Sequence, residues 1–144
     1  MDLSNKLTII IIGRSGSGKG TQASFVLKRL HDSGVKHLET GSLLREILNK
    51  RENPTTEIAR DVMKKGGIFP YWFASFTWVK EMIEHGVVAY HMVFDGAARK
   101  IEEARLLDDV VKWHGRHLRV GVYVDVSREE CSRRLLARQR ADDN

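Results

Sequence analysis

The stretch Gly13-Arg14-Ser15-Gly16-Ser17-Gly18-Lys19-Gly20-Thr21-Gln22 decides the fold of this chain. It follows an apolar, β-branched run at residues 7–12 and precedes a helical pattern that begins near Lys19. A strand, a glycine-rich turn and a helix N-terminus in that order make an anion site, because backbone N–H groups converge there and the helix dipole favours negative charge. Glycine at 13, 16 and 18 permits a positive φ and a close approach to a phosphate. The stretch is therefore predicted to bind the phosphate tail of a nucleoside triphosphate.

The spacing of Gly13, Gly18 and Lys19 fits the P-loop pattern. Gly20 stands where the common pattern has Ser or Thr, and Thr21 supplies a hydroxyl one residue later. The simple alternative is a glycine-rich linker before a helix. A dinucleotide-binding fingerprint is disfavoured, because its Gly-x-Gly-x-x-Gly pattern is not completed here.

Length and composition indicate one folded domain. The chain has 144 residues, 42% of them hydrophobic, with a formal net charge of +5, which suits a single buried core and argues against disorder. The positive charge is compatible with single-stranded RNA as a minor alternative, but an enzyme that holds several phosphates also needs cations, so no nucleic-acid partner is expected. Cys131 is the single cysteine, which excludes an intramolecular disulfide, and we expect it to be a packing residue.

The N-terminal region predicts neither export nor membrane insertion. Its apolar run at residues 9–12 is too short for a signal peptide and leads straight into the glycine-rich turn. No apolar run approaches membrane-spanning length. We therefore expect a monomeric cytoplasmic protein without membrane contact.

Strand and helix patterns alternate along the rest of the chain. The aromatic residues Phe25, Trp72, Phe73, Phe76 and Trp78 are predicted to lie on buried helix faces. The order implies an α/β fold with three αβα layers, the P-loop NTPase architecture, and a mostly parallel central sheet. Strands are expected at 7–12, 36–39, 87–95 and 118–126, and helices at 19–30, 42–49, from Asn53-Pro54 to Gly66-Gly67, 71–84, 100–114 and after a capping box at Ser127 and Glu130.

Polar residues are predicted at the carboxyl ends of the strands, where ligands bind in open α/β sheets. Besides the P-loop, these are Thr40-Gly41, Asp95-Gly96 and Asp125. Asp95 follows an apolar run, as does the carboxylate that organises Mg²⁺ in many P-loop proteins, and one carboxylate can suffice for that ion. The alternative for Asp95 is a turn-forming Asp-Gly pair, and Asp125 is expected to be structural.

Five segments follow one another along the chain: residues 13–22, 39–45, 63–70, 95–99 and 134–144. They resemble, in the same order, conserved segments of the adenylate kinases and related nucleoside monophosphate kinases. The family patterns are Gly-x-x-Gly-x-Gly-Lys-Gly-Thr-Gln, Ser-Thr-Gly-Asp-Leu/Met-Leu-Arg, Met-x-x-Gly-x-Leu-Val-Pro, Asp-Gly-Phe/Tyr-Pro-Arg, and a short lid with Arg-x-Asp-Asp-Asn.

This resemblance implies a single P-loop kinase domain over residues 1–144. A helical, monophosphate-binding insertion would span about 41–70, and a short lid would span 138–143. The implied activity is transfer of the γ-phosphoryl group of ATP to AMP, which gives two ADP, with Mg²⁺ as cofactor. The family continues beyond the Asp-Asp-Asn motif with one more arginine, a fifth strand and a helix. Since this sequence stops at Asn144, we expect a C-terminally truncated chain, either a fragment or one without the edge strand.

The resemblance also implies roles for individual residues, several of them arginines, whose guanidinium groups bind phosphate oxygens through paired N–H bonds. Lys19, Arg99, Arg138 and Arg140 would be catalytic, and Asp95 would hold Mg²⁺ through water. ATP would contact Gly16, Ser17, Gly18, Lys19, Gly20, Thr21, Arg134 and Arg138. AMP would contact Thr40, Gly41, Arg45, Gly67, Ile68, Phe69, Gly96, Ala97, Ala98, Arg99, Glu103 and Arg140.

The chain departs from the family pattern on the acceptor side. Glu103 stands where the family has a Gln that reads the adenine, and a carboxylate cannot donate to a ring nitrogen. Ala97-Ala98 replaces an aromatic residue and a proline. Two alternatives therefore stay open: a catalytically weak nucleotide-binding protein, and a kinase for another monophosphate or another small acceptor.

Overall fold

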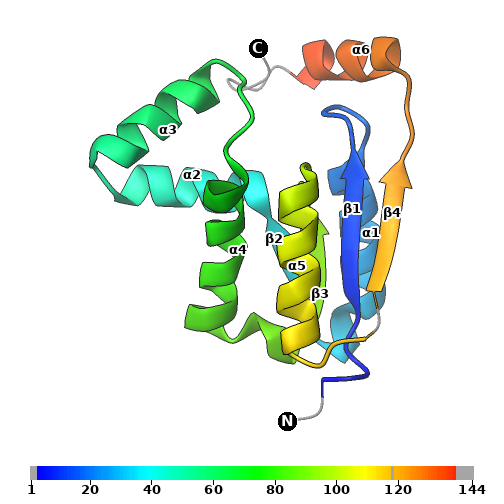
Figure 1. Ribbon diagram of the computed structural model, residues 1–144. Helices are drawn as coiled ribbons and strands as arrows, with labels where there is room; N and C mark the ends of the chain where they lie inside the picture. Colours follow the sequence, from blue (N-terminus) through cyan, green and yellow to red (C-terminus); the bar gives the residue numbers. More distant parts are fainter. Residues whose placement is uncertain (1–2, 118, 139–144) are drawn as a thin grey trace.

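The computed structural model describes residues 3–117 and 119–138 of the chain. An all-parallel sheet with the strand order β2-β3-β1-β4 lies at its centre, which confirms the predicted α/β fold. The elements in chain order are β1 (Thr8–Gly13), α1 (Lys19–Leu30), η1 (His31–Ser33), β2 (Val35–Glu39), α2 (Thr40–Lys50), α3 (Pro54–Lys64), α4 (Tyr71–His85), η2 (Val87–Ala89), β3 (His91–Asp95), α5 (Ile101–Trp113), β4 (Arg119–Val124) and α6 (Arg128–Arg138) (Figure 1).

Alternate residues of the central strands face opposite helical layers. Ile9 and Ile11 of β1 and Val93 of β3 pack with α1 on one face. Met92 and Phe94 pack with α4 and α5 on the other. Strands buried on both faces read as continuous apolar runs, which is why the sequence pattern identified them.

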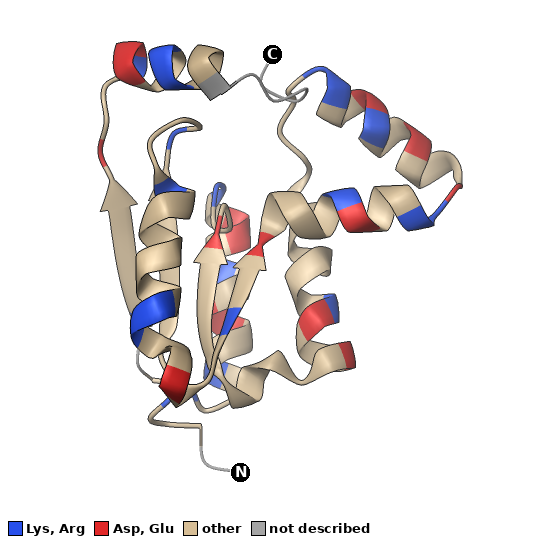
Figure 2. Ribbon diagram, turned by 180° about the vertical axis from the view of Figure 1, so that it is seen from behind, with Lys and Arg blue, Asp and Glu red and all other residues tan. Residues whose placement is uncertain are grey.

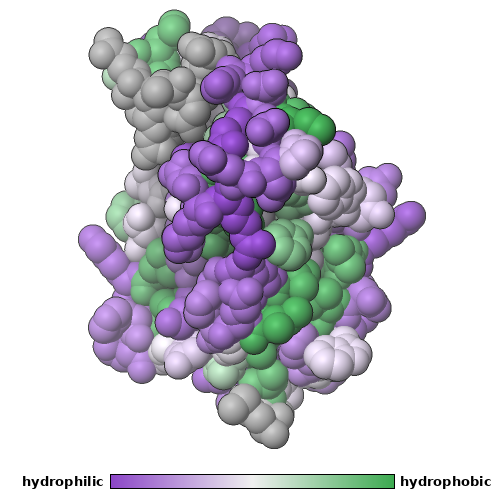
Figure 3. All heavy atoms as spheres, turned by 90° about the vertical axis from the view of Figure 1, so that its left-hand side faces the viewer, coloured by the Kyte–Doolittle hydropathy of each residue, from purple (hydrophilic) through white to green (hydrophobic). Residues whose placement is uncertain are grey.

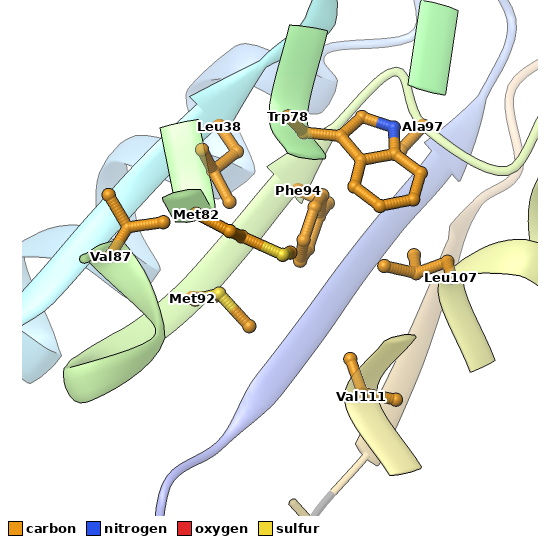
Figure 4. Close-up of a cluster of buried hydrophobic side chains, with 9 residues drawn as sticks. All are labelled: Leu38, Trp78, Met82, Val87, Met92, Phe94, Ala97, Leu107 and Val111. Atoms are coloured by element: carbon orange, nitrogen blue, oxygen red, sulfur yellow. The ribbon is translucent and has the colours of Figure 1, made fainter. Parts of the chain in front are cut away.

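The larger core cluster lies between the sheet and the helices α4 and α5 (Figure 4). Trp78 is fully buried, and its ring meets the ring of Phe94 edge-on at 5.9 Å between centroids. Leu107 and Val111 of α5 close the cluster from the other side. The loop residue Ala97 also belongs to it, so this core extends to the carboxyl end of β3.

A smaller cluster holds α2 and α3 against the start of α4. It is formed by Leu44, Leu48, Ala59 and Phe73. Helix α3 begins as predicted: Asn53 caps it by accepting a hydrogen bond from the Thr56 backbone N–H, and the Thr56 side chain accepts a bond from the Asn53 backbone N–H. This helical pair stands beside the carboxyl end of the sheet (Figure 1).

The predicted strand at 87–95 is wrong in its first half. Gly86 ends α4 in the left-handed region with φ +58, and Val87–Ala89 then forms a 3₁₀ turn with local backbone bonds. Val87 is buried in the core cluster, which explains its apolar character without a strand. The strand β3 begins only at His91.

Two of the four α4 aromatic residues predicted for the core are at the surface. Trp72 and Phe76 are 54% and 46% exposed, whereas Phe73 and Trp78 are buried. Residues 72 and 76 lie four apart, on the stripe of α4 that points away from the sheet. The face formed by α2, α3 and α4 accordingly shows apolar side chains among hydrophilic ones (Figure 3).

The predicted capping box before α6 is only half formed. The Ser127 hydroxyl accepts a hydrogen bond from the Glu130 backbone N–H at 3.3 Å. The Glu130 carboxylate pairs instead with Arg133 and Arg134, which lowers its pKa to about 2. Cys131 is buried, as expected for a packing residue. No helix in the described part of the chain is long and apolar enough to cross a membrane.

Arg116 holds the end of the sheet opposite the glycine-rich loop. Its guanidinium, fully buried, donates to the Thr8 hydroxyl and to the backbone oxygens of Leu7, Val88 and Tyr90. Burial lowers its pKa to about 10. These bonds tie the turn after α5 to the beginnings of β1 and β3.

Candidate functional site

A cleft of about 810 Å³ opens at the carboxyl ends of the parallel strands. The predicted P-loop and the predicted acceptor segments both line it, so residues far apart in the sequence meet in one space. From the donor side these are Gly16, Gly18, Lys19, Gly20, Thr21 and Arg134; from the acceptor side Thr40, Gly41, Arg45, Gly67, Ile68, Phe69, Gly96, Arg99 and Glu103; and between them Asp95.

The glycine-rich loop owes its shape to Gly16 and Gly18, whose φ angles are +81 and +94. A Cβ at position 16 would also lie 2.5 Å from the backbone oxygen of Cys131 in α6. Gly13 differs from the prediction, because it lies outside the positive-φ region and is needed for close packing against Val124 of β4. The loop is thus held between α6 and the sheet.

Two cations stand at this loop. The Lys19 ammonium donates to the Arg14 backbone oxygen at 2.7 Å, and the Arg134 guanidinium donates to the Ser17 backbone oxygen at 3.4 Å. Ser17 itself is buried outside the cleft lining, and its hydroxyl has no partner among the described residues. Any contact between Ser17 and a ligand in the cleft therefore has to come from its backbone.

Asp95 lies at the end of β3, next to Glu39 at the end of β2. Figure 2 shows these acidic strand ends side by side. Burial raises the pKa of Asp95, and Glu39 adds to this, while Lys19, His37 and Arg99 oppose it. A Cβ at position 20 would lie 3.8 Å from the Asp95 carboxylate, so this group faces the start of α1.

The donor set fits a magnesium ion only together with a nucleotide. No group of three His, Cys, Asp or Glu side chains in the described ranges could hold a metal. Mg²⁺ commonly keeps several waters and is bound by one or two carboxylates plus substrate phosphates. A single buried carboxylate that faces the phosphate-binding loop matches that requirement.

The acceptor side of the cleft combines apolar walls with few polar groups. Thr40 is buried, and its hydroxyl has no partner among the residues that the structure describes. Arg45, one turn later on α2, is 3.4 Å from the Glu39 carboxylate. Ile68 and Phe69 form the opposite wall. An unpartnered hydroxyl beside apolar walls is the kind of arrangement that orients a planar ligand.

The loop after β3 contributes less to the cleft than predicted. Gly96 and Arg99 line it, but Ala97 is buried in the core beneath it, and Ala98 is not part of the lining. Neither alanine lines the cleft, and the AMP contacts that the resemblance implied for Ala97 and Ala98 stay predictions. Glu103 reaches the cleft from α5, where its carboxylate accepts a hydrogen bond from the Arg99 backbone N–H at 3.0 Å.

Part of the predicted site falls outside the described residues. This part comprises the side chain of Arg138, the residue Arg140 and the predicted lid at 138–143 beyond Arg138. Their roles stay predictions.

Several residues that line the cleft were not predicted from the sequence. Ser24 and Phe25 line it, although Phe25 was predicted to face the core. Their position three and four residues after Thr21 places them on the same face of α1, a signal that was present in the sequence. His37 and Glu39 also line the cleft, because alternate residues of β2 point to one side.

Comparison with known proteins agrees with this geometry. A family model described as an AAA domain matches residues 12–144. An adenylate kinase from Parabacteroides distasonis is 32% identical over 142 residues, which cover 96% of this chain and 72% of that protein. An adenylate kinase from Thermus thermophilus is 36% identical over 140 residues, covering 94% and 70%. The chain belongs to the adenylate kinase family. It is accordingly an ATP-dependent phosphotransferase of the nucleoside monophosphate kinase class, as the sequence motifs predicted.

Proposed function

We propose that this adenylate kinase family member transfers the γ-phosphoryl group of ATP to AMP, giving two ADP. One observation carries the proposal: the phosphate-binding loop and the acceptor segments open into the same cleft. Transfer between two nucleotides needs them positioned in line and shielded from water, while the protein supplies little covalent chemistry. A shared cleft supplies both conditions.

The donor phosphates would lie on the loop at residues 16–21. Backbone N–H groups at the start of α1 would donate to them, and the helix dipole would add to the attraction. Lys19 already bonds the backbone oxygen of Arg14 and would neutralise charge on the transferring group. Arg134, beside the loop, would contact the donor from α6. Arg138 and Arg140 complete this proposed set.

Asp95 would hold Mg²⁺ through water, and the ion when bound would neutralise charge on the phosphate oxygens. Burial of its carboxylate disfavours the ionised form, as the raised pKa shows. A cation beside it would favour that form. A bound Mg²⁺ would thus stabilise the ionised form of the buried Asp95 carboxylate, which supports the proposal that Asp95 holds this ion.

The acceptor would lie between the start of α2 and the segment at residues 67–69. Thr40 and Gly41 would contact the base, and Arg45 and Arg99 would bind the phosphate from two sides. Since Glu39 lies against Arg45, the acceptor phosphate would compete with a carboxylate for that guanidinium. Cytoplasmic location and a monomeric state stay predictions of the sequence.

The test is turnover of the Lys19→Met variant in an assay of ADP formation from ATP and AMP with Mg²⁺. We expect a loss of about a hundredfold or more in kcat, since a cation directed at developing charge is removed. Lys28→Met is the matched control, because Lys28 is an exposed lysine on the same helix outside the cleft lining. Equal turnover of both variants would contradict the catalytic role of Lys19.

A further inference from the structure

We propose that Glu103 is a positioning residue, which fixes the backbone of Arg99 so that its guanidinium stands over the acceptor side of the cleft. The inference rests on the proposed function, since it concerns how the acceptor phosphate is bound. It replaces the role that the family resemblance implied, direct contact with the acceptor base.

The loop between β3 and α5 needs such a support. Ala97 anchors it in the core, but Ala98 next to it has a φ of +56, the only positive φ of a non-glycine residue in the described ranges. This conformation costs an L-residue roughly 1–2 kcal/mol. It persists only where surrounding contacts hold it.

Glu103 supplies the holding contact from the first turn of α5. The residue is only 2% exposed, and one carboxylate oxygen accepts the Arg99 backbone N–H at 3.0 Å. Lys100, the N-cap residue of α5, makes no side-chain cap bond. The carboxylate therefore links the residue before this helix start to the first turn of α5, and a hydrogen bond to a charged acceptor is stronger than one between neutral groups.

Because the Arg99 backbone is held by this bond, the position from which its side chain extends is fixed. The guanidinium lies over Gly96: a Cβ at that position would be 3.3 Å from Arg99 Nη2. From there it lines the cleft and acts on the charge of Asp95. Because a shift of about 1 Å in a substrate-positioning group can cost a hundredfold in rate, anchoring this backbone affects catalysis.

The second oxygen of Glu103 separates this role from base recognition. It is buried and has no hydrogen-bond partner among the described residues. A base-reading role would use that oxygen and depend on the base of the acceptor. A positioning role uses the oxygen that is already bonded, and depends on Arg99 alone.

The experiment is a double-mutant cycle with Glu103→Ala, Arg99→Ala and the double variant. KM and kcat for AMP are measured, together with AMP affinity by titration calorimetry. We expect Glu103→Ala to lower kcat/KM for AMP by about 10-fold to 100-fold while KM for ATP is unchanged. In the Arg99→Ala background the same substitution should change kcat/KM by about twofold or less, since coupled residues are not additive.

Two further variants complete the test. Glu103→Gln keeps an oxygen that can accept the Arg99 N–H, so it should restore most of the loss. Glu102→Ala is the matched control, because Glu102 carries the same charge on the same turn and is exposed. Additive effects of Glu103→Ala and Arg99→Ala, or an effect of Glu103→Gln that differs between AMP and pyrimidine monophosphates, would overturn the inference.

The cycle also distinguishes this inference from the proposed function. If AMP binding shows the coupled pattern but the wild-type chain forms no ADP, the proposed function alone is contradicted. If ADP forms and the effects are additive, the inference alone is contradicted. Absence of both AMP binding and ADP formation contradicts both.

Discussion

Ala98 is the residue whose backbone conformation suits its side chain least. Its φ of +56 is unfavourable for alanine and neutral for glycine. We therefore expect Ala98→Gly to raise the free energy of unfolding by up to about 1 kcal/mol. Ala98→Pro, which restores the residue of the family pattern, should lower it instead, because proline fixes φ near −65°. Urea unfolding of the three proteins measures this, and a proline variant as stable as the wild type would contradict the loop conformation.

His91 makes the stability of the sheet depend on pH. Its Nδ1 accepts the Leu7 backbone N–H at 2.9 Å, which requires the neutral ring. Burial, and then the charges of Lys6 and Arg116, lower its pKa below the ordinary value of 6.5. A depressed histidine pKa means that the unfolded chain binds the proton more readily. The contribution of neutral His91 to the free energy of unfolding is therefore complete above pH 6.5 and is lost as the pH falls below that value.

We expect the free energy of unfolding to fall further for the wild type than for His91→Asn between about pH 7.5 and pH 5. Asparagine offers an acceptor oxygen but does not titrate in this range. The other histidines are common to both proteins, so their contributions cancel in the difference. Parallel pH curves for the two proteins would show that His91 is not held neutral by its surroundings.

Among individual residues, the sequence predicted those whose role can be recognised from their immediate neighbours in the chain. Lys19 follows a glycine spacing and Asp95 follows an apolar run, each typical of a phosphate or metal site, and both residues line the cleft. Arg116 could not be predicted, because its partners, the Thr8 hydroxyl and three backbone oxygens, lie up to 109 positions away along the chain. The burial of Ala97 could not be predicted either, because an alanine side chain does not indicate whether its loop directs it toward the core or toward the cleft.

The hydrophobic pattern of helix α4 does not determine which of its aromatic residues are buried. All of its tryptophans and phenylalanines are predicted to lie in the core, yet only two are buried: Trp78, which packs against the sheet, and Phe73, which packs against α2 and α3. A helical period identifies stripes, but the amphipathic contrast that distinguishes inside from outside is weak when both stripes are apolar. The strand predicted at 87–90 was wrong for a similar reason, since a buried apolar turn and a buried strand look alike over a few residues.

The two tryptophans of α4 should therefore differ in their effect on stability. Trp78→Ala removes a fully buried ring from the main core and should cost about 3–5 kcal/mol of unfolding free energy. Trp72→Ala, where the ring is half exposed, should cost about 1 kcal/mol or less. Chemical denaturation followed by circular dichroism compares them. Costs of similar size would contradict the orientation of α4.

In the whole molecule, the site is formed mainly by the parallel direction of the strands. Because every strand runs the same way, the loops after β1, β2 and β3 meet at one edge. The alternation of strands and helices was enough to predict this meeting. The resemblance placed Arg134 at the ATP site, and its guanidinium does lie beside the loop. The packing of Cys131 against Gly16 was not predicted, since nothing local in α6 indicates that contact.

Phosphoryl transfer from ATP to AMP can be followed directly at the phosphorus atoms. The chain is mixed with ATP, AMP and Mg²⁺, and the ³¹P NMR spectrum is recorded over time. We expect the signals of ATP and AMP to decline together while two ADP form for each pair consumed. Release of inorganic phosphate without loss of AMP, or consumption of ATP that is indifferent to added AMP, would contradict it.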